Sequence, residues 1–217
     1  MTLADRLACA LERNDEEPNI KLAQNLAEQK DISGEILELF GIVNHGSKSQ
    51  KHDAIKVLYE LAALRSEAFG DKVKFAIDLL DTKDNRVVWG ALTLVSEISH
   101  TDPDQVFRKL KKISNAAENG SVIAKDRAFE ILVKLASYAD YSTEITSQIE
   151  ATLQTAAPNQ LPMYAEKSVS AFSGRNPESV IEILQNRIDD LATEAKRKRL
   201  QKVIKTLQNP PSLPALS

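Results

Sequence analysis

The chain of 217 residues is long enough to bury a sizeable core, and its formal net charge of −3 argues against a molecule whose whole surface binds polyanions. Its 7 glycines and 5% aromatic residues, among abundant Ala, Leu, Glu and Lys, favour an all-helical protein. The single cysteine, Cys9, cannot form an internal disulfide, and no apolar run approaches the ~18 residues of a membrane span. We therefore expect a cytoplasmic protein that does not interact with a membrane.

Residues 1–30 predict a helical hairpin that caps the N-terminal end of the fold. Leu3, Leu7 and Leu11 recur at helical spacing over residues 2–13. Pro18 then opens a second helix that continues to about residue 29, because the first turn of a helix needs no backbone donor. This pair lies outside the register of the later helices, which is typical of a terminal capping unit.

Four later segments repeat one helical pattern at a fixed spacing. Each has a small residue followed by mostly apolar residues three, four and seven positions further on, which defines one buried helix face. The small residues are Ala54, Ala91, Ala128 and Ala165, each 37 residues after the one before. A shorter step leads to a fifth helix that begins its core face at Leu200. A fixed period of this length indicates a stacked array of helices.

A second set of helices alternates with the first and keeps the same period. Its core positions include Ile36, Val73 and Leu110, again 37 residues apart. Turn residues at 44–47, 81–84, 119–121 and 158–159 separate the two helices of each repeat. The helix around Ile149 lags this register by two residues, which predicts a small loop insertion at 140–142. Residues 1–208 are therefore predicted to form a single domain, followed by a Pro-rich flexible tail over 209–217.

The repeated alanines, together with the Asp-x-Arg-Val opening at Asp84, Arg86 and Val87, resemble the HEAT/armadillo class of α-solenoid proteins over residues 32–207. This resemblance implies an all-α fold, a right-handed α-solenoid of stacked antiparallel helical hairpins. Because HEAT-type repeats usually run ~40 residues or more, a period of about 37 residues indicates a compact HEAT-like repeat. The resemblance also implies that the second helix of each hairpin, here called helix B, lines a concave surface.

The outward face of the B helices supplies the candidate binding residues. Positions two before, two after and six after each anchoring residue point away from the core at ~100° per residue. They form a row that we predict to contact a partner: His52, Lys56, Glu60, Trp89, Thr93, Glu97, Asp126, Glu130, Lys134, Met163, Lys167, Lys198 and Lys202. Nine of these are selected as candidate partner-binding residues: His52, Lys56, Trp89, Thr93, Asp126, Glu130, Lys167, Lys198 and Lys202.

Trp89, the only tryptophan, has two interpretations. It can anchor a partner, since tryptophan is enriched among interface hot spots, or it can lean onto the neighbouring B helix near Lys56 or Phe129. Gly90 beside it can allow an adjacent helix to approach closely.

Two basic runs also allow two interpretations each. Residues 196–199, with Lys202 and Lys205, can contact phosphate groups, or they can form a solvated terminal helix balanced by nearby acidic residues. The run at 108–112 is interpreted as a solvated face on the convex side of the array.

The residues that could carry catalysis are scattered. The three histidines have no metal-ligand spacing, and there is no Gly-rich phosphate loop, so we expect no catalytic residues, no metal and no cofactor. HEAT-like DNA glycosylases place Trp, Asp and Arg on a concave surface, which Trp89, Asp126 and Arg127 resemble in residue type only.

These observations lead to two hypotheses. The first is a non-catalytic scaffold that binds another protein on the concave B-helix surface. The second is nucleic-acid binding, or a DNA glycosylase-type activity, that uses the concave surface and the C-terminal basic helix.

Overall fold

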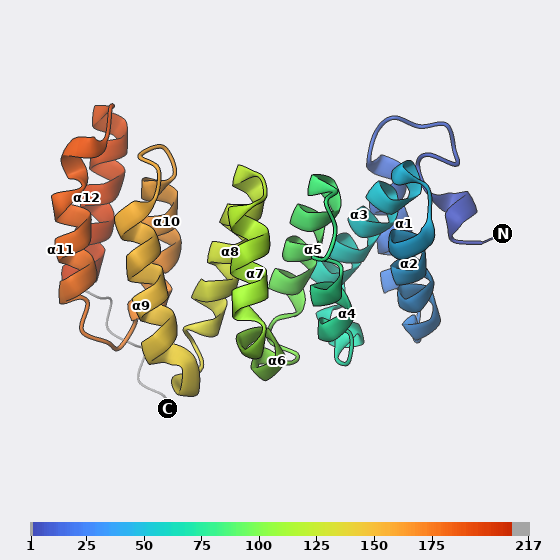
Figure 1. The fold of residues 1–217 in the computed structure, drawn as a ribbon, viewed down its shortest axis with the longest axis horizontal. Coiled ribbons are helices and arrows are strands. Elements are labelled where there is room, and N and C mark those ends of the chain that lie inside the picture. The colour runs from blue at the N-terminus through green and yellow to red at the C-terminus, as the bar shows by residue number, and fades with distance from the viewer. Residues whose placement is uncertain (1, 210–217) are drawn as a thin grey trace. The chain divides into compact units, whose positions relative to one another are not determined.

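Helices are the only regular secondary structure in residues 2–209, the part of the chain that the computed structural model describes (Figure 1). The predicted all-α class is therefore confirmed. The chain divides into two compact units, Met1–Ile131 and Leu132–Ser217, and each is described by itself. A single solenoid over residues 1–208, its handedness and its structural period stay predictions. Residues 210–217 of the predicted tail lie outside the described part.

The N-terminal segment corrects the predicted capping hairpin, because residues 2–13 do not form an α-helix. They contain a 3-10 helix, η1 (Ala4–Arg6), followed by turns. Side chains from the following helices take up their backbone donors: the N–H of Ala8 donates to Oδ1 of Asn19 at 3.0 Å, and that of Cys9 to Oδ2 of Asp53 at 2.8 Å. These side-chain acceptors replace the helical hydrogen bonds that the spacing of the leucines predicted.

The first unit contains α1 (Glu17–Ala27), α2 (Ser33–His45), α3 (Lys48–Leu64), η2 (Ser66–Phe69), α4 (Val73–Asp78), α5 (Asn85–Ile98), α6 (Pro103–Arg108), α7 (Leu110–Glu118) and most of α8 (Val122–Leu135). Pro18 lies in the first turn of α1, as predicted. Ser47 forms a capping box with Gln50 at the start of α3, and Asp84 and Asp102 cap α5 and α6 through their carboxylates. The predicted turns at 44–47 and 81–84 thus end at the residue that caps the next helix, and the turn at 119–121 lies between α7 and α8.

Helices α3 and α5 form the centre of this unit. Helix α3 packs against α1, α2 and α5, and α5 packs against α3, α4 and α7. The anchoring residues Ala54 and Ala91 are fully buried, while Ala128 is half-buried. Gly90 allows the close approach of the two helices, because a Cβ atom there would lie 2.6 Å from Cγ1 of Ile55.

The second unit contains the end of α8, α9 (Ala139–Thr155), α10 (Leu161–Ser168), η3 (Val169–Phe172), α11 (Glu178–Asn186), η4 (Ile188–Asp190) and α12 (Glu194–Gln208). Helix α9 packs against α10 and α11, and α12 packs against α10 and α11. Arg187, in the turn after α11, joins this turn to the end of α9. Its guanidinium group donates to the carbonyl oxygens of Leu153, Gln154 and Ala156. The predicted loop insertion at 140–142 is wrong, since these residues lie in the first turn of α9.

The described helices also bear on the expectation about membranes. None of them is long and apolar enough to cross a bilayer.

Candidate partner-binding surfaces

An aromatic pair that includes Trp89 of the predicted binding row joins α3 to α5. The ring of Trp89 packs against the ring of Tyr59 with 5.9 Å between centroids and a tilt of 47°. Both side chains are half-buried. Trp89 therefore leans onto the neighbouring B helix, with Tyr59 as its aromatic neighbour, and still keeps part of its surface in solvent.

Lys56 lies beside this pair and is buried, which differs from the solvent-facing position expected of it. Its ammonium group contacts Glu60 at 2.6 Å and Glu16 at 3.1 Å, and lies 4.9 Å from the centre of the Tyr59 ring. Burial alone lowers the pKa of Lys56, but its hydrogen bonds to Glu60, Tyr59 and Glu16 outweigh burial and raise that pKa above its ordinary value. The side chain is thus a fixed cation rather than a mobile surface lysine.

Glu16 ties the N-terminal segment to both central helices. Besides Lys56 it contacts Arg86 of α5, with 2.6 Å between Oε1 and Nη2. Arg86 follows Asp84, the cap of α5, whose Oδ1 accepts from the backbone N–H groups of Arg86 and Val87. The group of Glu16, Lys56, Tyr59, Arg86 and Trp89, which we call the Trp89 surface, is therefore held in place by contacts across three segments of the chain.

His52 is paired with Asp84, with 2.8 Å between Nε2 and Oδ2. Burial raises the pKa of Asp84, but the hydrogen bonds from His52 and from the backbone of Arg86 and Val87 outweigh it and keep that pKa below its ordinary value. A pocket of about 510 Å³ opens beside this pair, and Cys9 and Asp53 lie in its wall. Burial, together with the hydrogen bond and charge of Asp53, raises the pKa of Cys9 to about 11, so its thiol stays protonated near neutral pH.

The other candidate residues have different surroundings. Thr93 was expected to face solvent, but it is buried, and its hydroxyl donates to the carbonyl oxygen of Trp89 at 2.9 Å. Asp126 and Glu130 are half-buried on α8, where Glu130 pairs with Arg127 at 2.7 Å. Lys167, Lys198 and Lys202 belong to the second unit, where Lys167 is half-buried and the other two are exposed. The structure therefore brings Lys56 and Trp89 together around Tyr59, while Lys167, Lys198 and Lys202 belong to the other unit.

The C-terminal basic helix is partly neutralised within the second unit. Arg199 makes a two-pronged contact with Glu166 of α10, at 2.8 and 2.6 Å, and Arg197 lies 4.0 Å from Glu194. Lys198 and Lys202 are left as exposed cations on α12.

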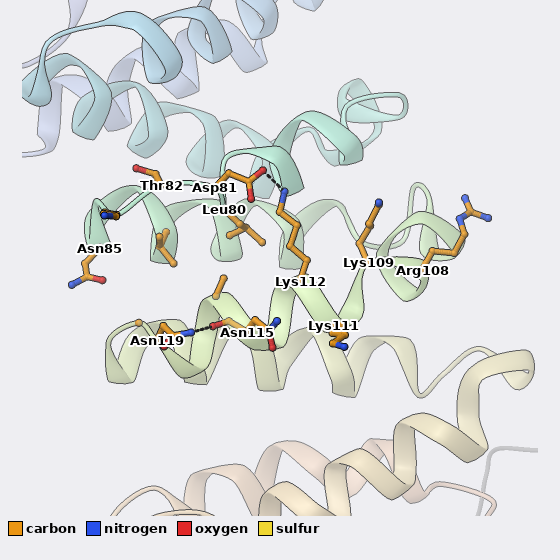
Figure 2. Close-up of a pocket in the computed structure, with 14 residues that line it drawn as sticks. Leu80, Asp81, Thr82, Asn85, Arg108, Lys109, Lys111, Lys112, Asn115 and Asn119 are labelled. Carbon is orange, nitrogen blue, oxygen red and sulfur yellow. Dashed lines mark hydrogen bonds and ion pairs between the residues drawn. The ribbon is translucent and has the colours of Figure 1, made fainter.

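A second surface escaped the sequence analysis. A groove of about 840 Å³ lies between the α4–α5 turn and the helices α6 and α7, and the basic run at 108–112 lines it (Figure 2). The run was expected to be a plain solvated face on the convex side. Its four cations have only one acidic residue at helical spacing, Asp104 four positions before Arg108, and this unbalanced charge was the signal that could have identified it. We call this feature the basic groove.

No group of His, Cys, Asp or Glu side chains in residues 2–209 is arranged to hold a metal ion. Comparison with protein-family models, with curated proteins and with solved structures found no match for this chain.

Proposed function

We propose that the chain is a non-catalytic protein-interaction module, a right-handed α-solenoid of HEAT-like hairpins that binds a partner protein in the cytoplasm through its B helices. The Trp89 surface carries this proposal. Tryptophan, tyrosine and arginine are the residues most often found at interface hot spots. Here Trp89 and Arg86 lie on α5, and Tyr59 lies on α3, which packs against α5.

Preorganisation supports the same site. Trp89 is held by Tyr59, and Lys56 and Arg86 are held by Glu16. Side chains that are already ordered lose less conformational entropy when a partner covers them. The surface also combines two cations with the carboxylate of Glu16, and this mixed charge suits a folded protein better than a uniformly charged polymer.

The decisive comparison uses a second aromatic pair in the same unit. Phe75 of α4 is 45% exposed, packs against Phe40 at 5.8 Å, and has the ammonium group of Lys72 at 5.8 Å from its ring. It therefore matches Trp89 in chemistry but lies on the other helix of its hairpin. A photoreactive phenylalanine at position 89 should crosslink a partner in native lysate, whereas the same group at position 75 should not.

The crosslinked partner, once purified, gives the quantitative test. We expect Trp89→Ala to weaken its binding by at least about tenfold, as for a hot-spot residue, and Phe75→Ala to change binding by less than about twofold. Lys56→Glu should also weaken binding, because it breaks the contacts with both Glu16 and Glu60. Equal losses at positions 75 and 89, with unchanged circular dichroism, would contradict the proposed site.

The competing proposal is nucleic-acid binding or base excision. Its support is the pair of exposed cations Lys198 and Lys202 on α12. It requires DNA binding that falls steeply with salt and is weakened by Lys198→Glu with Lys202→Glu. A gel-shift at low salt that shows no complex removes it.

A further inference from the structure

We propose that the basic groove binds an extended acidic polypeptide segment. Lys83, Arg108, Lys109, Lys111 and Lys112 line the groove, and Asp81 is the only carboxylate in its lining. The protein as a whole carries a net charge of −3, so this concave surface is a local exception that concentrates positive potential.

Several of these cations are available to a ligand. Lys83, Lys109 and Lys111 are exposed and make no ion pair with any residue that the structure describes. Lys112 is already paired: its ammonium group contacts Asp81 across the groove at 2.7 Å (Figure 2). It also approaches Asp78 at 3.7 Å. The protein's own carboxylate therefore already takes a position that a ligand carboxylate could take.

The arrangement of the cations favours an extended ligand. Figure 2 shows Arg108, Lys109 and Lys111 pointing in different directions instead of converging on one point. From Lys111 to Asn119 the groove follows α7, a length of about 12 Å at ~1.5 Å per helical residue, and Arg108 and Lys109 extend it beyond the start of that helix. An extended peptide of about four residues spans the part along α7 at ~3.3 Å per residue.

The remaining lining distinguishes a peptide from a nucleic acid. No aromatic side chain lines the groove, so it lacks a platform on which bases could stack. Apolar side chains of Leu80 and Val88 lie in its wall, and the amides of Asn85 and Asn115 can bond to peptide groups. A segment that combines carboxylates with an apolar side chain matches this mixture, whereas a polyphosphate backbone matches only the cations.

The test uses a fluorescein-labelled peptide of about eight residues that contains alternating Glu and Leu, with its Gln counterpart as the uncharged probe, in fluorescence anisotropy at low salt. We expect the acidic peptide to bind and the Gln peptide not to bind. Lys109→Glu combined with Lys111→Glu should weaken binding by about tenfold, because two exposed attractions become repulsions. Lys30→Glu combined with Lys48→Glu is the matched control, since both lysines are exposed in the same unit and lie outside the groove.

A variant that should bind more tightly serves as a second test, because unfolding of the protein cannot produce such a gain. Asp81→Asn removes the carboxylate that competes for Lys112, so it should strengthen binding by about two- to fivefold. Trp89→Ala should leave it unchanged, so this result is independent of the proposed function. The proposal is overturned if the acidic peptide does not bind, if the control pair weakens binding as much as the groove pair, if Asp81→Asn weakens binding, or if a thymidine oligonucleotide binds the groove more tightly than the peptide.

Discussion

Helices α5 and α12 start from the same sequence pattern and lie in different surroundings. Both bury the predicted stripe: Ala91, Leu94, Val95 and Ile98 in α5, and Leu200, Val203, Ile204 and Leu207 in α12. In α12 these are the only buried residues of the helix, whereas α5 also buries Val87, Val88, Gly90, Leu92, Thr93 and Ser96. Helix α5 packs against α3, α4 and α7, whereas α12 packs against α10 and α11. The larger buried area of α5 leaves less of its surface exposed to a partner.

The substitutions with the largest expected difference in stability are at the residue that follows the first residue of the buried stripe in each helix. Leu92 follows Ala91 and is fully buried, while Gln201 follows Leu200 and is exposed. Leu92→Ala should lower the free energy of unfolding by ~2–5 kcal/mol, because it removes buried methyl groups and leaves a cavity. Gln201→Ala should change it by less than ~0.5 kcal/mol. Urea denaturation of both variants measures the contrast, and similar small effects would mean that α5 buries only one face.

The close approach of α5 and α3 predicts opposite signs for two glycine substitutions. Gly90→Ala improves helix propensity by ~1 kcal/mol but forces a Cβ atom against the β-branched side chain of Ile55, which costs ~1–3 kcal/mol. We expect net destabilisation of up to ~2 kcal/mol. Gly41→Ala in α2 meets no atom within 4 Å and should stabilise by ~0.5–1 kcal/mol. Thermal melts that show the same sign for both variants would refute the close approach.

The N-terminal cap of α5 also makes more contacts than the N-terminal cap of α12. Asp84 caps α5 and also contacts His52, while Thr193 at the start of α12 is exposed and accepts from the N–H of Lys196. Asp84→Ala should cost ~1–2 kcal/mol and Thr193→Ala ~0.5–1 kcal/mol, since both lose a cap but only the first also loses a partner. Equal losses in denaturant titrations would show that His52 adds nothing to the cap.

The same carboxylate predicts a pH dependence. Because the fold lowers the pKa of Asp84 below its ordinary value of 3.8, its stabilising contribution is complete above that pH and is lost as the pH falls through the folded-state pKa. The variant Asp84→Asn should therefore lose less stability than the natural chain on acidification below about pH 4. Urea midpoints measured at pH 7 and at acid pH give this comparison, and parallel curves would contradict it.

The smallest effects are expected for two single contacts between neighbouring helices, one between aromatic rings and one between charges. A double-mutant cycle on Tyr59 and Trp89 should give a coupling of ~0.5–1.5 kcal/mol that salt does not change, because the contact is between rings. A cycle on Glu166 and Arg199, both more than a third exposed, should give ~0.2–1 kcal/mol and weaken as salt screens the pair. Salt-sensitive coupling in the aromatic pair would contradict the contact at Trp89.

The helical periodicity of the sequence was sufficient to locate the predicted stripe that each of these helices buries. It located the α5 and α12 core faces, the turns between helices and the start of α1, because these depend on residues close together in the sequence. It failed where distant residues decide. Nothing local to residues 2–13 indicates that Asn19 and Asp53 will accept their backbone donors, and so that segment was wrongly predicted as helical.

The candidate site shows the same limit. Trp89 and Lys56 were selected from their helical positions, but Lys56 is paired with Glu16, which lies 40 residues earlier in the chain and contacts both α3 and α5. The basic groove was missed for a related reason. It forms only when the turn before α5 faces α6 and α7, a pairing that the spacing within either segment does not contain.

Amide hydrogen exchange tests most directly the claim that the central helices are covered on more than one side. In native conditions the backbone amides of α5 should exchange only through global opening of their unit, and those of α12 should exchange faster, since one packed stripe holds that helix. Mass spectrometry of peptides covering residues 85–98 and 194–208 reports both rates in one sample. Faster exchange in α5 than in α12 would contradict the account.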